Sequence, residues 1–181
     1  DQRLALAGEV ARTVFWEIDF DADQLRVDAE RLRDLNIATD PPIQRLSDWV
    51  GRIHPDDRDR FVHGVAKAVL PGAPPFDMEY RACDVSGDWA WIHTRAGTVR
   101  RDAQGRSTRV VGTAMNITAR KAAESVLREQ DSRLAAVFQA SPLPSVITRV
   151  VTGEVLDVND AGLLWFGAPR EQVIGRSVDS L

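Results

Sequence analysis

Apolar and polar residues alternate along several stretches of the chain, a pattern typical of half-buried β-strands. In the first of these, every second residue from Val14 to Phe20 is apolar. The predicted strands cover residues 14–20, 24–28, 76–84, 88–100 and 107–118. Asp21-Ala22-Asp23 turns the chain between the first two, which therefore pair as a hairpin. Ser86-Gly87 and Gln104-Gly105 provide the turns between the last three strands.

Helical spacing of apolar residues predicts several short helices around these strands. They are a helix over Gln2 to Arg12, one after Asp28, one capped by Ser47, and one from His54 to about Val69. Asp28 is a suitable N-cap for the second, which has Leu32 and Leu35 on its buried side. Asp40-Pro41-Pro42 ends that helix, because proline cannot continue it. The predicted order is therefore helix, two strands, short helices, three strands and a final helix.

The final helix follows the last strand without a loop. After Gly112 the chain has neither glycine nor proline until Pro142, and the stretch is rich in Ala, Leu, Glu and Arg. No flexible residue separates the strand from the helix, so strain in the sheet must bend or rotate the helix. We therefore expect Asn116, Ile117 and Thr118 to transmit a signal, together with Leu127 and Leu134 farther along the helix.

The chain also contains an internal repeat, which has to be recognised before a fold is assigned. Asp1-Gln2-Arg3-Leu4-Ala5 recurs as Asp131-Ser132-Arg133-Leu134-Ala135, and Leu25-Arg26-Val27-Asp28 matches Leu156-Asp157-Val158-Asn159. The later matches pair Leu32 with Leu163, Leu35 with Phe166 and Asn36 with Gly167. We interpret the chain as one complete unit followed by about the first third of a second.

Composition adds few constraints. The 181 residues are 44% apolar and carry a formal net charge of −4, which argues against a nucleic-acid-binding surface. Cys83 is the only cysteine, so the chain has no internal disulfide and suits a reducing compartment. We see no apolar run long enough for a membrane span and no signal peptide. Since the sequence begins without Met, we expect a cytoplasmic fragment of a larger protein, and membrane attachment of that larger protein stays open.

The ordered set of motifs resembles the PAS domain family, in the branch with an HPDDR segment and a PAC-type C-terminal half. The motifs are His54-Pro55-Asp56-Asp57-Arg58, Glu79-Tyr80-Arg81, Trp91-Ile92, and Gly112 to Thr118 leading into Arg120-Lys121. In the second unit, Val158-Asn159-Asp160-Ala161, Phe166-Gly167 and Val173-Ile174-Gly175-Arg176 resemble the opening half of another PAS domain. The family usually closes with Asp-Ile-Thr, whereas this chain has Asn116, which keeps hydrogen bonding but loses the charge.

The resemblance implies an α+β fold, with a five-stranded antiparallel sheet and short helices over one face enclosing a small cavity. It also implies a domain organisation: an N-terminal helix (residues 1–13), a complete PAS domain (14–118), a signalling helix (119–140) and the N-terminal part of a second PAS domain (141–181). Proteins of this family sense ligands, light or redox state, or dimerise, and pass the signal to kinases, cyclases or other output domains through the C-terminal helix.

Trp16, Trp49, Tyr80, Ile92 and Met115 are the candidate lining of a ligand or cofactor pocket. The alternative is that these large side chains are plain core, as aromatic residues in small domains often are. The cofactor is left unknown: FAD or another small molecule is possible, and so is none. Haem is not expected, because His63 falls on a polar helix face. Cys83 lacks the Asn-Cys-Arg-Phe-Leu context of light-oxygen-voltage domains.

No catalytic constellation is present, and the chain is not expected to be an enzyme; kinase or cyclase activity would belong to an output domain. The HPDDR segment has two interpretations, a metal or acid–base site and a helix start. The helix start is favoured because proline fits the first turn, acids favour the positive end of the helix dipole, and metal-ligand spacing is missing. We therefore predict no metal site.

Two features favour a homodimer. Trp89 and Trp91 share one face of their strand while Ile92 takes the other, so both faces of the sheet need a cover. The second cover would be the N-terminal helix or another subunit. In the final helix, residues spaced by four and three positions form a coiled-coil seam: Ala123, Leu127, Gln130, Leu134 and Val137. The alternative is a lone amphipathic helix packed on its own domain.

These patterns predict a sensory and regulatory segment that detects a small ligand or cofactor state and signals through its C-terminal helix to a downstream output domain. Three alternatives stay open: a ligand-free PAS dimerisation module, a flavin-based redox sensor, and an enzyme with an unrecognised site.

Overall fold

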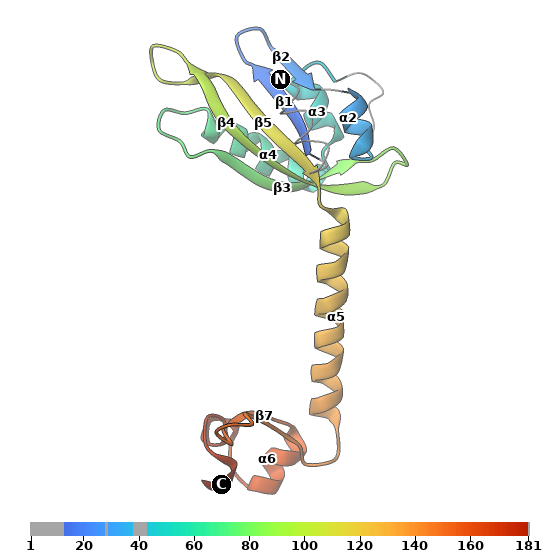
Figure 1. The fold of residues 1–181 in the computed structure, drawn as a ribbon, viewed down its shortest axis with the longest axis vertical. Helices are drawn as coiled ribbons and strands as arrows, with labels where there is room; N and C mark the ends of the chain where they lie inside the picture. The colour runs from blue at the N-terminus through green and yellow to red at the C-terminus, as the bar shows by residue number, and fades with distance from the viewer. Residues whose placement is uncertain (1–12, 28, 38–42, 181) are drawn as a thin grey trace. The chain divides into compact units, whose positions relative to one another are not determined.

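A computed structural model describes residues 13–27, 29–37 and 43–180 (Figure 1). The chain divides into two compact units, with the boundary between Lys121 and Ala122. The predicted helix over Gln2 to Arg12, the Asp28 cap and the Asp40-Pro41-Pro42 stop lie outside the described residues.

The first unit is built on a five-stranded antiparallel sheet, as expected, with strand order β2-β1-β5-β4-β3 (Figure 1). The strands are β1 (Thr13–Asp19), β2 (Gln24–Val27), β3 (Phe76–Cys83), β4 (Trp89–Arg101) and β5 (Ser107–Asn116). Gly87 and Gly105 adopt φ values of 90° and 80° in the turns between β3, β4 and β5. Only glycine adopts such values readily, which is why the two Xaa-Gly pairs mark these turns.

Burial alternates along β4, because successive side chains point to opposite faces of a sheet. Ala90, Ile92, Thr94 and Ala96 are buried on the inner face, whereas Trp89 is exposed and Trp91 half-buried on the outer face. The alternation predicted from Trp89, Trp91 and Ile92 is therefore confirmed.

Three helices cover the inner face: α2 (Ala29–Asp34), α3 (Leu46–Arg52) and α4 (Pro55–Ala68) (Figure 1). Their buried residues Leu32, Trp49 and Phe61 join Ile18 and Tyr80 in one hydrophobic core. At ~25 cal/mol per Å² of apolar surface, this burial is the main source of stability.

The predicted start of α3 is wrong. Ser47 lies inside the helix, and the N-cap position belongs to Arg45. The Asp48 carboxylate accepts the N–H groups of Gln44 (3.0 Å) and Arg45 (2.8 Å). These bonds hold the pKa of Asp48 below its ordinary value. A carboxylate three residues into the helix therefore sets its start in place of the serine hydroxyl.

The interpretation of the HPDDR segment as a helix start is confirmed. His54 is the N-cap of α4, its Nδ1 accepts the N–H of Asp56 at 3.2 Å, and Pro55 is the first helical residue. Asp56 and Asp57 lie in the first turn, where the helix dipole favours negative charge.

Helix α5 (Thr118–Ala140) begins two residues after the end of β5, with Ile117 alone between them. None of the described helices combines the length and apolar character that a membrane span requires.

The second unit is smaller. It contains a hairpin of β6 (Val146–Thr148) and β7 (Val155–Val158), followed by α6 (Asp160–Phe166), α7 (Arg170–Val173) and a short 3₁₀ helix (Val178–Ser180). Its buried core is formed by Val155, Val158 and Val173.

Candidate functional site

A small cavity lies between the helices and the inner face of the sheet, with a volume of about 40 Å³. Trp16 from β1, Trp49 from α3 and Tyr80 from β3 line it, so the structure brings three of the five candidate pocket residues together. The rest of the lining is almost entirely apolar. At ~30 Å³ per group, a space of this size holds one or two water-sized groups.

The polar groups at the cavity wall form one connected chain. The Trp49 indole Nε1 donates to the Tyr80 hydroxyl at 3.0 Å, and that hydroxyl lies 2.9 Å from the Thr94 Oγ1. Burial raises the pKa of Tyr80 to about 12, so its hydroxyl is neutral at physiological pH. These three polar groups satisfy one another's hydrogen-bonding capacity without a ligand. The cavity therefore suits an apolar occupant or none.

The other two candidates lie elsewhere. Ile92 is completely buried in the core but does not line the cavity. Met115 is 38% exposed, because its neighbour Ala114 takes the inner face and alternation turns Met115 outward beside His93. The prediction that Met115 lines the pocket is therefore corrected.

Gly112 lies beside the cavity residue Trp16, a contact that its place in the Gly112–Thr118 motif did not reveal. It pairs with Trp16 across β1 and β5. A Cβ at this position would lie 2.3 Å from Trp16 Cζ2 and 2.5 Å from the Arg95 carbonyl oxygen. Only glycine lets the indole lie against the sheet, and a glycine inside a predicted strand is the signal for such a close approach.

A flavin or a haem does not fit this cavity. Pockets for such ligands measure ~300–1,000 Å³, against about 40 Å³ here. His63 is exposed on α4, with Nδ1 2.7 Å from the Asp59 carbonyl oxygen. Cys83 lies at the end of β3 and is not among the described lining residues. Within the described residues, no group of His, Cys, Asp and Glu side chains is placed to hold a metal ion.

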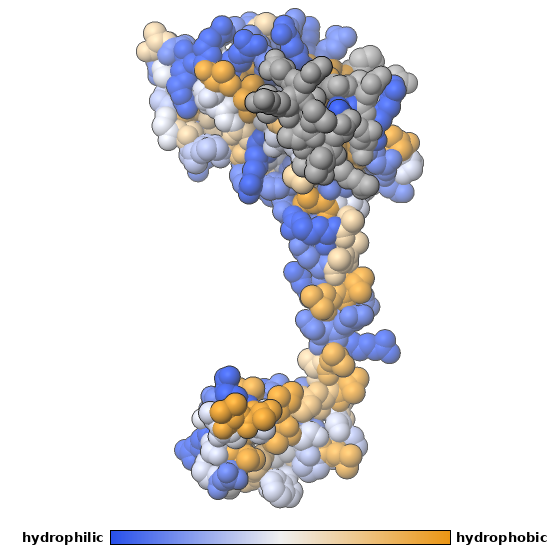
Figure 2. Space-filling model, in the orientation of Figure 1, coloured by the Kyte–Doolittle hydropathy of each residue, from blue (hydrophilic) through white to orange (hydrophobic). Residues whose placement is uncertain are grey.

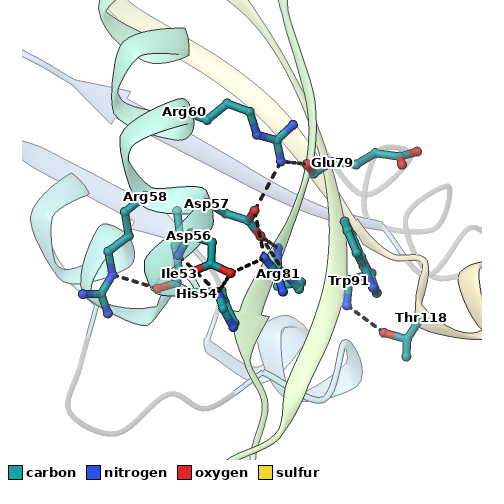
Figure 3. Close-up of polar contacts among 10 residues, drawn as sticks. All are labelled: Ile53, His54, Asp56, Asp57, Arg58, Arg60, Glu79, Arg81, Trp91 and Thr118. Carbon is teal, nitrogen blue, oxygen red and sulfur yellow. Dashed lines mark hydrogen bonds and ion pairs between the residues drawn. The ribbon is translucent and has the colours of Figure 1, made fainter.

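Ion pairs connect α4 to β3 (Figure 3). The Arg81 Nε donates to Asp57 Oδ2 at 2.9 Å, and the Arg81 backbone N–H donates to the same oxygen at 3.0 Å. The Asp57 side chain is only 10% exposed. The Arg81 hydrogen bonds hold the pKa of Asp57 below its ordinary value. Arg60 adds a bond to the Glu79 carbonyl oxygen at 2.8 Å.

A second set of charges connects β3 to α5. The Glu79 carboxylate contacts Lys121 Nζ at 2.6 Å and Arg120 Nη2 at 2.5 Å. The hydrogen bond from Lys121, and then the one from Arg120, hold the pKa of Glu79 below its ordinary value. Lys121 Nζ also lies 5.1 Å from the centre of the Trp91 ring, and the Arg81 guanidinium 5.7 Å from it. We call Glu79, Trp91, Arg120 and Lys121 the junction cluster.

The backbone of the junction is held from β4. The Ile117 N–H donates to the Trp91 carbonyl oxygen at 2.8 Å. The Trp91 N–H donates to the Thr118 hydroxyl at 2.9 Å (Figure 3). Ile117 itself is 7% exposed. The first turn of α5 is therefore attached to the sheet by backbone as well as by charge.

Asn116 uses both ends of its amide. Its Nδ2 donates to the Leu35 carbonyl oxygen at 2.7 Å, and its Oδ1 accepts the Thr118 N–H at 2.9 Å. The residue thus connects the end of α2 to the start of α5. An aspartate lacks the donor for Leu35, which gives a physical reason for an asparagine in place of the aspartate of the Asp-Ile-Thr family motif.

Farther along α5, Leu127 and Leu134 are 60% and 69% exposed, and Val137 is 64% exposed. Apolar side chains are visible along this helix in Figure 2. No residue of α5 is buried within the part of the chain that the structure describes.

Comparisons with known proteins agree with this architecture. Residues 27–114 match the family model described as PAS fold. The chain is 29% identical over 133 residues to the sensor protein FixL of Bradyrhizobium diazoefficiens, covering 74% of the chain and 26% of FixL. It is 29% identical over 129 residues to the two-component sensor PprA of Pseudomonas aeruginosa, covering 71% of the chain and 13% of PprA. The chain therefore spans about a quarter or less of the length of these relatives.

Among solved structures, a sensory box histidine kinase/response regulator from Burkholderia thailandensis is similar, with a TM-score of 0.60 and 28% identity. The match covers 74% of this chain and 98% of that one. The family match and the shared five-stranded antiparallel architecture lead to one conclusion: the segment of residues 27–114 has the PAS fold.

Proposed function

We propose that this chain is a sensory segment of a signal-transduction protein, which detects a small ligand in its first unit and passes the signal through α5. The similarity to sensor proteins such as FixL and PprA supports this role. The segment has no chemistry of its own in this proposal. Kinase or cyclase activity belongs to an output domain of the same polypeptide, in the cytoplasm.

The junction carries the proposal. β5 contributes Ala114 to the inner cavity and ends at Asn116, and α5 begins at Thr118. The junction cluster, the Trp91–Thr118 bond and Asn116 fix the first turn of α5 to β3, β4 and α2. A displacement of β5 by a ligand therefore moves α5, since no free hinge lies between them.

The switch needs two arrangements of the sheet that differ in ligand affinity, because a ligand shifts an equilibrium only by its differential affinity. The weak elements are the ion pairs of Glu79, which are partly exposed and so contribute little each. A modest binding energy is then enough to exchange them for another arrangement.

Dimerisation is the second part of the proposal. The exposed apolar residues of α5 (Val126, Leu127, Leu134 and Val137) need a partner, and a second copy of the same helix supplies a matching stripe. The outer sheet face, with Trp89 42% exposed, is the other candidate contact. The N-terminal helix proposed to contribute lies outside the described residues.

We also propose that the second unit is the opening part of another PAS domain. The HPDDR segment would assign the first unit to the branch of the PAS family that carries this motif. The order of hairpin and helix in β6, β7 and α6 repeats that of β1, β2 and α2, which supports this assignment.

An insertion tests the transmission step. One alanine between Arg120 and Lys121 rotates the rest of α5 by about 100° and should abolish or invert output in the full-length signalling protein, while the first unit stays folded. An insertion of about seven residues, which returns the helix nearly to its original phase, is the control and should restore output. Unchanged output with the single insertion would contradict rigid transmission.

A ligand-free dimerisation module is the remaining candidate, and the small volume of the inner cavity favours it. Native mass spectrometry separates the two: a dimer that carries no additional mass after purification and after exposure to metabolite extracts supports the module. Retained additional mass supports the sensor.

A further inference from the structure

A second hollow of about 190 Å³ lies beside the inner cavity. It is bounded by the C-terminal half of α4, by residues 73–75 and by β4 and β5. Five residues line both spaces and so form the wall between them: Trp16, Ile18, Leu46, Phe61 and Thr94. We call this second space the Arg101 crevice, after its charged lining residue.

The lining of the Arg101 crevice is mostly apolar and carries one positive charge. Ile18, Phe61, Val65, Phe76 and Val110 supply apolar surface. Thr98 and Arg101 supply polar groups from β4. Among the described lining residues, Arg101 is the only charged one. A hollow with this distribution suits a ligand that is apolar along its length and negative at one end.

The Arg101 guanidinium is oriented with donors to spare. Its Nη1 donates to the Gly105 carbonyl oxygen at 2.8 Å and to Ser107 Oγ at 3.3 Å. Its Nε and Nη2 make no hydrogen bond to any residue that the structure describes. The adjacent Asp102 carboxylate is bound by Arg106 Nε at 2.8 Å and does not neutralise Arg101. Arginine presents two parallel N–H groups that match a carboxylate.

We propose that the Arg101 crevice binds a small amphipathic monocarboxylate, with its carboxylate on Arg101 and its tail between α4 and the sheet. Each water-sized group fills ~30 Å³ of liquid volume, so the crevice holds a tail of about six such groups. The ligand class is therefore an unbranched carboxylate of about six to eight carbons.

This site lies on the strand that leads to α5. Ser107, which holds Arg101, is the first residue of β5, and Val110 of the same strand lines the crevice. The β4–β5 register is irregular between Thr98 and Arg101, beside the site. A ligand here acts on the opposite end of β5 from Asn116. The signalling consequence rests on the proposed function, whereas binding does not.

The test is a calorimetric titration of the 181-residue chain with octanoate, and separately with octan-1-ol, which has the same tail and no charge. We expect saturable binding of octanoate at one site per chain and at least ten-fold weaker binding of the alcohol. Arg101→Gln should weaken octanoate binding about ten-fold and leave that of the alcohol unchanged. Arg100→Gln is the matched control, since Arg100 lies on the same strand, pairs with Asp21 and does not line the crevice.

Val65→Phe places a larger side chain in the apolar lining and should abolish binding of both compounds, with folding checked by circular dichroism. If this variant does not fold, Arg101→Gln still decides the assignment. Equal affinity for octanoate and octan-1-ol, or an Arg101→Gln variant that binds octanoate like the wild type, would overturn the carboxylate assignment. Absence of octanoate binding would overturn the site as a whole. The insertion in α5 reads output instead of binding, so a failure of the proposed function is recognised separately.

Discussion

Leu25 and Leu156 occupy the same place in the internal repeat, on the second strand of a hairpin that leads into a short helix. Leu25 is 8% exposed and Leu156 is 44% exposed. In the first unit, β5, β4 and β3 extend the sheet beyond this hairpin, and α3 and α4 complete the cover. In the second unit, the described residues form a two-stranded sheet only. Val155 is fully buried next to Leu156, and the register shift between Ile147 and Thr148 gives the inner face to this valine. A hairpin and a helix alone also leave part of their apolar surface in water.

Local geometry is nevertheless shared by the two units. Asn36 after α2 and Gly167 after α6 adopt φ values of 61° and 67°. Left-handed residues of this kind end helices, and the sequence repeat aligns these two positions. The comparison separates what a short stretch determines, namely the turn and the helix end, from what needs distant strands, namely burial.

Charged pairs differ in the same way. Asp57 and Arg81 have side chains 10% and 27% exposed, whereas Asp157 and Arg170 of the second unit are 36% and 42% exposed. Breaking a buried pair leaves one charge desolvated without a partner, while an exposed pair is replaced by water.

The largest difference is expected from removing the two aspartates. Asp57→Ala should lower the free energy of unfolding of the first unit by about 3 kcal/mol or more. The matched Asp157→Ala should cost the second unit about 0.5 kcal/mol. Hydrogen exchange in a urea series, read by mass spectrometry for each unit, measures both. Equal losses would show that burial does not distinguish the pairs.

The pH dependence of the stability of the first unit gives a second test of the Asp57–Arg81 pair. The pKa of Asp57 is lower in the folded chain than its ordinary value near 3.8, so its contribution is complete above that value. It is lost as the pH falls through the folded pKa, because the unfolded chain then binds the proton more readily. Asp57→Ala should therefore have a flatter stability profile than the wild type below about pH 4. If the stability of the variant and of the wild type changed in parallel below about pH 4, the lowered pKa of Asp57 would be contradicted.

The next largest difference is expected from truncating the two leucines to alanine. Leu25→Ala should destabilise the first unit by about 2–3 kcal/mol, in the range of buried leucine truncations. Leu156→Ala should cost the second unit less than about 1 kcal/mol, because its side chain is already partly in water. Denaturation midpoints of the two variants, measured as above, provide the comparison. A Leu156→Ala cost as large as that of Leu25→Ala would mean that the second unit buries this side chain in solution.

The last substitution concerns the junction between β5 and α5. Asn116→Asp restores the residue usual in relatives but places a carboxylate against the Leu35 carbonyl oxygen. We expect a loss of about 1–2 kcal/mol in the first unit, measured by chemical denaturation. Asn116→Ser is the control, because it keeps a hydrogen-bond donor on a side chain too short to contact the Leu35 carbonyl oxygen. A neutral or stabilising Asn116→Asp would show that the bond to Leu35 is not needed.

Much of the fold follows from local patterns. The alternation along β1 and β4, the Xaa-Gly turns and the helix start at Pro55 depend on near neighbours, and all of them were predictable. The direct passage from β5 into α5 was predictable as well, because the absence of glycine and proline is a property of the sequence itself.

The contacts that position the site were not predictable. Glu79 meets Arg120 and Asn116 meets Leu35 across 41 and 81 residues of chain, and no periodicity contains such pairings. The sequence also gives no measure of cavity volume, which decides against a flavin. Ser47 and Met115 were placed wrongly because Asp48 competes for the helix start and because strand register decides which face a side chain takes.

Hydrogen exchange at the amides of Ile117 and Lys121 tests most directly whether β5 and α5 are rigidly joined. These N–H groups donate to the Trp91 and Ile117 carbonyl oxygens at 2.8 and 2.9 Å. If the two are rigidly joined, both amides exchange as slowly as amides in the middle of β5, and Glu79→Gln accelerates exchange at Lys121 more than at Ile117. Rapid exchange of both amides in the wild-type protein, while β5 stays protected, would reveal a hinge and contradict the rigid joint.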